Sequence, residues 1–383
     1  MGIALIAITL LKLVLAALWG GTADIPQTLA QAQAFLAGRD LLDPASTGGN
    51  PSFFPIGHYL IAACCTLLSQ LTRMPFSFWI KTPAILADLG VAWLLKNMPR
   101  GGGRAAFFYM VNPVTFLLSV YHGQLHTVAM AAAVLAYWCA DQAWARRSGI
   151  ALGVAASVRQ HFAVLLLPLA IRSRKHRAAL ILTFAITALF INLRLLASAH
   201  LLRILFPTWT YGSWGYAMVF QHSPRLLGLN GQTTASILSM VNQTLHAYGP
   251  FFYLLWAVGF VIWSVRSHSD DHWTAALLFL LGIYVISPGF GVQWLVWVVP
   301  FWLIVNQWHA VGYSLIAGAF LAGSYWQWSL NAKYGVEALT ANLQLLSRAD
   351  LIGVVLVGAC GVLTWLYAFR AAWRLARATS VTS

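Results

Sequence analysis

The feature that most limits the fold of this chain is a series of long apolar runs, each of about 16 to 24 residues, that recur along it. An apolar run of about 18 or more residues is long enough to cross the hydrocarbon core of a bilayer as a helix. Only 8% of the residues are charged, against roughly 25% in an average soluble domain. The runs are continuous and rich in Leu, Ala and Val, whereas the strands of a membrane β-barrel alternate in polarity. The sequence therefore predicts an all-α, polytopic transmembrane helical bundle with about 11 to 13 membrane segments.

The first apolar run, residues 2–19, contains Lys12, and no small-residue cleavage pattern follows it before Asp24. We therefore expect a retained first span rather than a secretory signal. The four cysteines all fall within apolar segments, so we expect packing residues and no disulfide framework. The net charge of +14 comes from short basic clusters between apolar runs, which argues against a nucleic-acid partner.

The basic residues predict the side of the membrane on which each loop lies. More than half of the 23 Lys and Arg residues fall in five clusters, which the positive-inside rule places on the cytoplasmic side. An even number of crossings must join successive clusters, so the turn at residues 122–126 is predicted to be external. The clusters are Lys96, Arg100 and Arg104; Arg146 and Arg147; Arg172, Arg174, Lys175 and Arg177; Arg266; and Arg370, Arg374 and Arg377.

The segment between Arg147 and Arg172 has only about 24 residues, which suffices for one full span but not for two. A short broken hairpin with Arg159, Gln160 and His161 at its tip reconciles this length with basic residues at both ends. Such a tip lies at membrane depth, where it must line a wet cavity or be buried in protein. An intramembrane Arg is energetically costly and indicates a functional site, so Arg159 is a candidate phosphate or substrate contact.

A segment suited to the membrane surface follows the first span. It has Asp24-Ile25-Pro26 at its start and Gly38 at its end, the pattern of an amphipathic helix. Charge leaves open whether residues 56–71 cross the membrane. If they do not, the N-terminus is cytoplasmic and Asp24 is external, which is the arrangement we expect. The predicted apolar face comprises Ile25, Leu29, Ala32 and Leu36.

Several short motifs follow one another along the chain. Their order and spacing, up to about residue 170 and loosely around residues 287–302, resemble the GT-C superfamily of integral-membrane glycosyltransferases. The resemblance is to bacterial members that use polyprenyl-phosphate sugars and are related to polyprenol-phosphate-mannose mannosyltransferases. The motifs are Asp24-Ile25-Pro26, Phe53 to Leu60, Thr82 to Leu89, Asn112-Pro113 with Gly123-Gln124-Leu125-His126, Val158-Arg159-Gln160 ahead of Leu167-Pro168-Leu169, and Ser287 to Leu295.

The resemblance implies a catalytic role for Asp24. In that family the catalytic residue is an Asp just after the first span, at the start of a surface-lying helix in the first external loop. The second external motif of the family is Gly-Gln-x-Asp, and His126 stands here in place of the acid. This departure argues against a metal ion bridging two carboxylates. The alternative role for Asp24 is that of a helix N-cap, and the two roles are compatible.

Other polar residues are candidates for substrate binding. His122 and His126 are spaced i, i+4 and suit a sugar or phosphate oxygen, whereas a metal ion at this pair lacks an apparent third ligand. Arg225 falls in a long external segment, where a cation suits a lipid-linked phosphate. No cofactor is expected, and only a divalent cation stays open. The candidate substrate-binding residues are His122, Gln124, His126, Arg159, Gln160 and Arg225.

Some charged residues within apolar runs have structural explanations. Arg194 and Lys12 pair with neighbouring helices or extend toward the interface in this interpretation. Asp88 lies in the middle of an apolar run, and either Lys81 or Lys12 suffices as its partner.

The resemblance implies transfer of a sugar, mannose or another hexose or pentose, from polyprenyl phosphate to a lipid, glycan or protein acceptor with inversion. It also implies an inner (plasma) membrane protein with an extracytoplasmic active site. The expected organisation is a GT-C-like module at 1–200, with its first external loop at 21–75, a long external segment at 201–249, and C-terminal transmembrane helices at 250–383. A transporter or lipid-linked-sugar flippase is the main alternative, which an inverted repeat would favour. The second alternative is a non-catalytic assembly subunit, whose function would not depend on Asp24.

Overall fold

The computed structural model of the protein describes residues 1–43, 54–198, 201, 215, 231–267, 271–287, 289, 291–334 and 355–378. Every regular element in these ranges is a helix, which confirms the all-helical prediction for the described part of the chain. The chain forms two compact units. Unit 1 comprises Met1–Thr208, Asp270–Ala276 and Val299–Gln307, and unit 2 comprises Trp209–Ser269, Leu277–Val298 and Trp308–Ser383.

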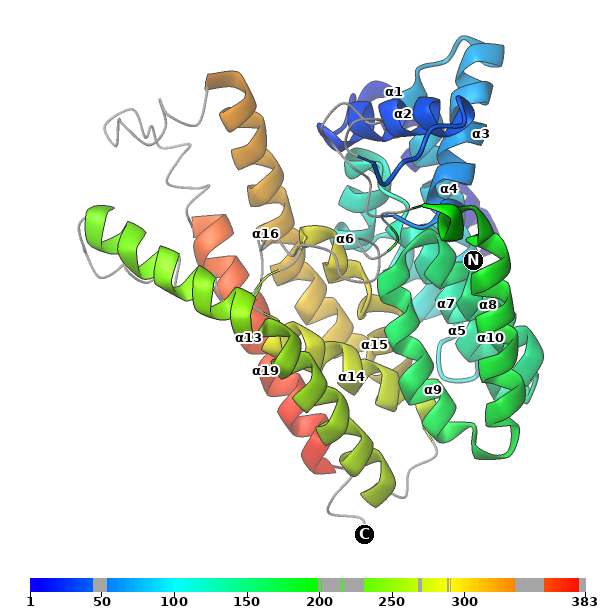
Figure 1. Ribbon diagram of the computed structural model, residues 1–383, viewed down its shortest axis with the longest axis vertical. Helices are drawn as coiled ribbons and strands as arrows, with labels where there is room; N and C mark the ends of the chain where they lie inside the picture. The colour runs from blue at the N-terminus through cyan, green and yellow to red at the C-terminus, as the bar shows by residue number, and fades with distance from the viewer. Residues whose placement is uncertain are drawn as a thin grey trace. The chain divides into compact units, whose positions relative to one another are not determined.

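Unit 1 is built around α4 (Phe76–Asn97). This helix packs against α1 (Gly2–Leu18), α3 (Ile56–Thr72), α5 (Gly102–Met110) and α7 (His126–Asp141). α2 (Asp24–Leu36) lies on α3 (Figure 1). Ile25 and Ala32 of its apolar positions are buried, as are Thr28 and Gln31, whereas Leu36 is 46% exposed. Packing against α3 therefore buries polar as well as apolar side chains of α2.

A buried ion pair joins three of these helices. Nζ of Lys12 in α1 lies 2.7 Å from Oδ2 of Asp88 in α4, and both side chains are fully buried. The hydroxyl of Tyr109 in α5 donates to Oδ1 of Asp88 at 3.2 Å. Of the two partners that the sequence allows for Asp88, the structure therefore selects Lys12.

The apolar run after α5 is bent. α5 is followed by α6 (Pro113–Phe116) and the π-helix η1 (Leu117–His122), with a bend of 45° between the two parts. Asn112 lies at the break and caps α6, since its Oδ1 accepts the backbone N–H of Val114 at 2.9 Å. η1 ends at His122 with Gly123 as its C-cap, and α7 begins at His126.

The next segments form the short broken hairpin. α8 (Ala145–Val158) ends where Arg159 adopts an extended backbone, followed by η2 (Gln160–Leu165), α9 (Leu166–Arg172), η3 (Arg174–His176), α10 (Arg177–Ile191) and η4 (Leu193–Ala197). α8 and α10 run parallel, because Gly149 lies against Leu180 and Thr183 while Gly153, one turn later, lies against Phe184 and Thr187. The chain must therefore turn at Arg159 and return through η2 and α9 before α10 begins (Figure 1).

The C-terminal half supplies the remaining elements. α13 begins at Gly231, inside the range 201–249, and continues without a break to Arg266. The first part of α14, up to Ala276, belongs to unit 1 and the rest to unit 2, whereas α15 belongs to unit 1. The elements are α13 (Gly231–Arg266), α14 (His272–Ile286), η5 (Val292–Val296), α15 (Val299–Val305), α16 (Gln307–Tyr334), η7 (Val355–Ala359) and α19 (Cys360–Ala378).

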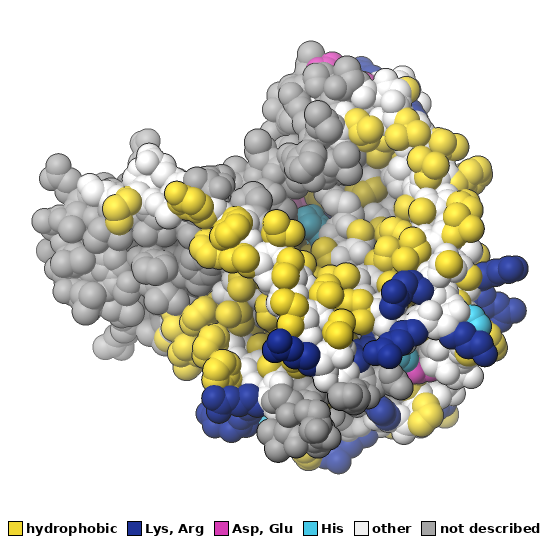
Figure 2. Space-filling model, turned by 60° about the horizontal axis from the view of Figure 1, so that its bottom comes forward, with side chains coloured by type: hydrophobic (Ala, Val, Ile, Leu, Met, Phe, Trp, Pro, Cys, Tyr) yellow, Lys and Arg dark blue, Asp and Glu magenta, His cyan; other side chains and the backbone are white. Residues whose placement is uncertain are grey.

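Two helical stretches in the described residues, Phe76–Asn97 and Leu356–Arg377, are long and apolar enough to cross a membrane, and the bent pair Gly102–Met110 with Pro113–His122 makes a third if it is one span. Several other apolar helices have 10–17 residues. Large apolar side chains are exposed on α1 and α10, such as Ile3 (85%) and Phe190 (73%). Figure 2 shows exposed hydrophobic side chains over much of the face in view, with Lys and Arg side chains at their border. Such surfaces are typical of contact with lipid.

Candidate functional site

Asp24 is the first residue of α2, and its carboxylate faces the turn that follows η1. Nε2 of His122 lies 2.9 Å from Oδ2 of Asp24, and the side-chain amide of Gln124 donates to the same oxygen. Because a carboxylate only accepts hydrogen bonds, His122 carries a proton on Nε2 in this arrangement. The Asp24 side chain makes no capping hydrogen bond, and the N-cap position is occupied by Ala23. The alternative role as an N-cap is therefore not what the structure shows.

Two glycines bring the loops of this site together. Gly21, before α2, has a φ of +95°, and Gly123, after His122, has a φ of +76°. A Cβ at Gly21 would lie 2.3 Å from Cδ1 of Ile25, and a Cβ at Gly123 would lie 2.9 Å from the same atom. The backbone angle therefore favours glycine at both positions, and at Gly21 a Cβ would also lie 2.9 Å from the carbonyl oxygen of Tyr121. Oγ1 of Thr22 donates to the carbonyl oxygen of His122 at 3.2 Å and joins the two loops directly.

Lys81 of α4 lies beneath these loops. It is fully buried, and its Nζ donates to the carbonyl oxygen of Ala16 at 3.3 Å and to that of Trp19. These carbonyls belong to the C-terminal end of α1, where an ammonium group also interacts favourably with the helix dipole. Lys81 thereby holds the end of α1 just before the loop that carries Asp24.

Gln124 connects Asp24 to Arg159. Its amide nitrogen donates to Asp24, and its Oε1 accepts from Nη2 of Arg159 at 3.1 Å. Arg159 is fully buried at the turn of the hairpin. Three segments far apart in the sequence, the start of α2, the turn after η1 and the tip of the hairpin, therefore meet at one place.

Arg159 also contacts an aromatic residue just before α3. Its guanidinium carbon lies 3.8 Å from the centroid of the Phe54 ring, and the ring of His58 lies 4.6 Å from the same ring. Nε and Nη1 of Arg159 and both ring nitrogens of His58 are buried without a hydrogen-bond partner among the described residues. An unpaired buried polar group destabilises a fold by about 1–3 kcal/mol, so these four atoms carry a cost in the ligand-free fold.

The electrostatics of the site keep Asp24 ionised. Partial burial raises the pKa of its carboxyl, but the hydrogen bond and charge of His122, the hydrogen bond of Gln124 and the charge of Arg159 lower it more. The pKa of Asp24 therefore lies below its ordinary value of 3.8. The Asp24 side chain remains 40% exposed, so an ionised carboxylate is accessible to a molecule outside the protein.

The other predicted site residues have different positions. His126 is buried at the start of α7, within electrostatic range of Arg159 and His122. Gln160 is half-buried at the start of η2, next to Arg159. Arg225 lies outside the described residues. In the described part of the chain, no three His, Cys, Asp or Glu side chains are placed to hold a metal ion.

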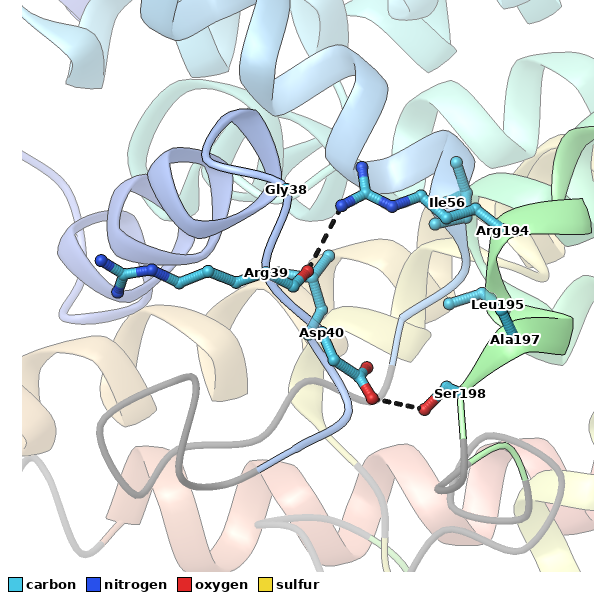
Figure 3. A pocket seen from close by; sticks show the side chains of 9 residues that line it. Gly38, Arg39, Asp40, Ile56, Arg194, Leu195, Ala197 and Ser198 are labelled. Atoms are coloured by element: carbon cyan, nitrogen blue, oxygen red, sulfur yellow. Dashed lines mark hydrogen bonds between the residues drawn. The ribbon is translucent and has the colours of Figure 1, made fainter.

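A pocket of about 190 Å³ lies at the other end of α2 (Figure 3). There Arg194 donates to the carbonyl oxygen of Arg39 at 3.3 Å, and Oγ of Ser198 donates to Asp40 at 2.8 Å. Neither Asp24 nor any other member of the hydrogen-bonded chain lines this pocket. Arg194 therefore joins η4 to the segment after α2, the structural role expected from its place in the sequence.

Comparison of the sequence with protein-family models and with curated proteins finds no match. The candidate site therefore stands on its own geometry. The sequence assigned no role to Phe54 or His58, and it offered Lys81 only as a partner for Asp88. Phe54 and His58 do fall within one of the short motifs, so a signal was present, but the contact of Arg159 with the Phe54 ring depends on how α3 and α8 pack.

Proposed function

We propose that this protein is an integral-membrane glycosyltransferase that takes its sugar from a polyprenyl-phosphate-linked donor. The observation that carries the proposal is the ionised, half-exposed carboxylate of Asp24, oriented by His122 and Gln124 at the junction between an apolar helix and a surface-type helix. This matches the position that the GT-C resemblance implies for the catalytic acid. The acceptor in this proposal is a lipid, a glycan or a protein outside the cytoplasm.

In the proposed reaction, the acceptor hydroxyl transfers its proton to the Asp24 carboxylate while its oxygen attacks the anomeric carbon. The bond between that carbon and the phosphate oxygen breaks, and polyprenyl phosphate leaves with the bonding electron pair. The configuration at the anomeric carbon is inverted. His122 and Gln124 keep the carboxylate turned toward the acceptor, and Arg159 offsets the negative charge that develops on the leaving phosphate.

The proposal includes a topology. Asp24 and the turn at residues 122–126 face the extracytoplasmic side, whereas both termini and the basic cluster at residues 172–177 face the cytoplasm. The hydrogen bonds between Asp24, His122 and Gln124 support the first part, because loops that meet must lie on the same side. Labelling of single introduced cysteines from either side of the membrane tests it, and labelling of position 24 only from the cytoplasm would contradict it.

A transfer assay tests the proposed activity. The purified full chain in lipid vesicles is supplied with a radiolabelled polyprenyl-phosphate hexose or pentose and an acceptor fraction from the native envelope, and nucleotide sugars serve as the control donors. We expect transfer from the polyprenyl-phosphate donor alone. Movement of the intact donor across the vesicle membrane without transfer would instead support a flippase.

A further inference from the structure

We propose that His58 and Arg159 together form a buried site for a phosphate anion, bounded on one side by the Phe54 ring. The identity of its ligand, the phosphate of a polyprenyl phosphate, rests on the proposed function. The site itself rests on the buried side chains described above. It adds His58 to the groups that contact the donor and predicts that the donor is recognised by its phosphate whether or not a sugar is attached.

The donors of Arg159 point to an anion. Only Nη2 is engaged, by Gln124, while Nε and Nη1 have no partner in the described residues although the whole side chain is buried. No carboxylate in the described residues forms an ion pair with it. The Asp24 carboxylate acts on Arg159 through its charge but forms no hydrogen bond to it. Burial of a guanidinium charge is costly, and an anionic ligand bonded to Nε and Nη1 offsets that cost.

His58 supplies a second set of hydrogen-bonding atoms beside the same ring. It is 1% exposed, and neither ring nitrogen has a partner among the described residues. Its ring and the Arg159 guanidinium both contact Phe54, at 4.6 Å and 3.8 Å from the ring centroid. Phosphate has several acceptor oxygens in a tetrahedral arrangement, so one phosphate group is able to accept N–H groups from both side chains at once.

The backbone around the two residues is fixed. A Cβ at Gly57 would lie 2.5 Å from the carbonyl oxygen of Ser157, so only glycine permits this approach of α3 to α8. Asn192 of unit 1 ties the same two helices, because its Oδ1 accepts the N–H of Ile56 at 2.9 Å and its Nδ2 donates to Oγ of Ser157 at 3.0 Å. His58 follows Gly57, and Arg159 follows the end of α8. The junction therefore holds both residues against the Phe54 ring before any ligand binds, as a preorganised site requires.

Binding to the purified full chain in lipid nanodiscs tests this site without any catalytic turnover. The probes are polyprenyl phosphate without a sugar, the matching uncharged polyprenol, and inorganic phosphate. The variants are His58→Phe, which keeps an aromatic ring but removes its nitrogens, and Arg159→Met, which keeps the length but removes the charge. The matched controls are His309→Phe on α16 and Arg147→Met, whose guanidinium stacks on Trp144 away from the site.

We expect the parent to bind polyprenyl phosphate at least about tenfold more tightly than polyprenol, and each site variant to lose about 10- to 100-fold in affinity, as for a lost hydrogen bond to a charged group. The controls should bind as the parent does. If Arg159→Met does not fold, His58→Phe alone decides. Parental affinity in His58→Phe, or equal binding of polyprenol and polyprenyl phosphate, would overturn the site.

The inorganic phosphate arm identifies the source of the anion. Weak binding of inorganic phosphate beside tight binding of polyprenyl phosphate supports a lipid ligand. Equal binding of both, lost in the same variants, supports the anion site and overturns its assignment to a lipid. A chain that binds polyprenyl phosphate in the expected way but transfers no sugar keeps this site and contradicts the proposed function. Sugar transfer by the parent, together with parental phosphate binding in His58→Phe, supports the proposed function and overturns this site.

Discussion

Nε2 of His122 lies 2.9 Å from Oδ2 of Asp24, although the two residues are 98 positions apart in the sequence. Asp24 begins α2, and His122 is the last residue of the π-helix η1. Gln124 bonds to the same carboxylate oxygen and passes the connection to Arg159 at the hairpin turn. The contact therefore joins the first loop of the chain to two later segments.

The first prediction concerns the pH dependence of stability. The pKa of Asp24 is lower in the fold than the ordinary 3.8, so ionised Asp24 stabilises the fold above that pH, and the contribution is lost as the pH falls through the folded-state pKa. Gln124→Leu removes one of the hydrogen bonds that lower this pKa. We expect Gln124→Leu to unfold at a lower temperature than the parent near neutral pH, with the difference shrinking below about pH 4.

A matched control is Gln33→Leu, because Gln33 is exposed on the same helix and distant from Asp24. The effect of Gln33→Leu on the unfolding temperature should not vary with pH, because this substitution does not change the pKa of Asp24. Thermal unfolding of both variants between about pH 3 and pH 7 makes the comparison. A pH-independent difference between Gln124→Leu and the parent would show that Gln124 acts on the fold without acting on Asp24.

The second prediction concerns the buried ion pair between Lys12 and Asp88. Lys12→Met leaves a fully buried carboxylate with only Tyr109 as its partner, so we expect a loss of about 3–5 kcal/mol in the free energy of unfolding. The double variant Lys12→Met with Asp88→Leu removes both charges and should recover much of that loss. Denaturant or thermal unfolding in detergent measures both. Equal losses in the single and double variants would contradict the argument.

An exposed ion pair in the same unit supplies the comparison. Nη1 of Arg100 lies 2.7 Å from Oδ2 of Asp271, but the Arg100 side chain is 59% exposed. Arg100→Met should therefore change the free energy of unfolding by at most about 1 kcal/mol.

The third prediction concerns the junction of α3 and α8. Gly57→Ala places a Cβ 2.5 Å from the carbonyl oxygen of Ser157, which must force the helices apart and separate His58 from Arg159. We expect a lower unfolding temperature and weaker binding of polyprenyl phosphate. Gly90→Ala is the control, since a Cβ at that position of α4 has nothing within 4 Å and alanine favours a helix. A Gly57→Ala protein that binds and unfolds as the parent does would show that the junction tolerates separation.

Much of the fold follows from local pattern. The apolar runs predict most of the helices of unit 1, because burial of continuous apolar surface in a helix needs no information beyond the run itself. The turn at Arg159 was also predictable, since the segment between two basic clusters is too short for two spans. The burial of Thr28 and Gln31 was not, because the contact of α2 with α3 decides which polar residues of an amphipathic helix are buried.

The site is only partly predictable for a related reason. Asp24 and Gln124 were candidates through the GT-C resemblance, and His122 and Arg159 through residue type and position. Their hydrogen bonds depend on long-range packing that no spacing encodes. The positive φ at Gly21 and the close approach at Gly57 become visible only when the neighbouring loop or helix is in place. Lys81 was a possible partner of Asp88, whereas in the fold it binds backbone carbonyls at the end of α1.

The central claim is that Asp24 is the general base of glycosyl transfer, and the rate of Asp24→Asn tests it most directly. Asn keeps the size of the side chain and an oxygen that accepts hydrogen bonds from His122 or Gln124, so the loop contacts are largely retained. Asp40→Asn is the matched control, because Asp40 is also a half-buried acid that accepts hydrogen bonds, from Leu42 and Ser198.

The measurement is sugar transfer from a polyprenyl-phosphate donor by purified parent, Asp24→Asn and Asp40→Asn, each first shown to be folded by thermal unfolding. Loss of a positioned base lowers a rate by about 100- to 10,000-fold, so we predict a loss of that size in Asp24→Asn and a near-parental rate in Asp40→Asn. A folded Asp24→Asn protein that transfers sugar at close to the parental rate would contradict the account, and His126 would become the next candidate for the base.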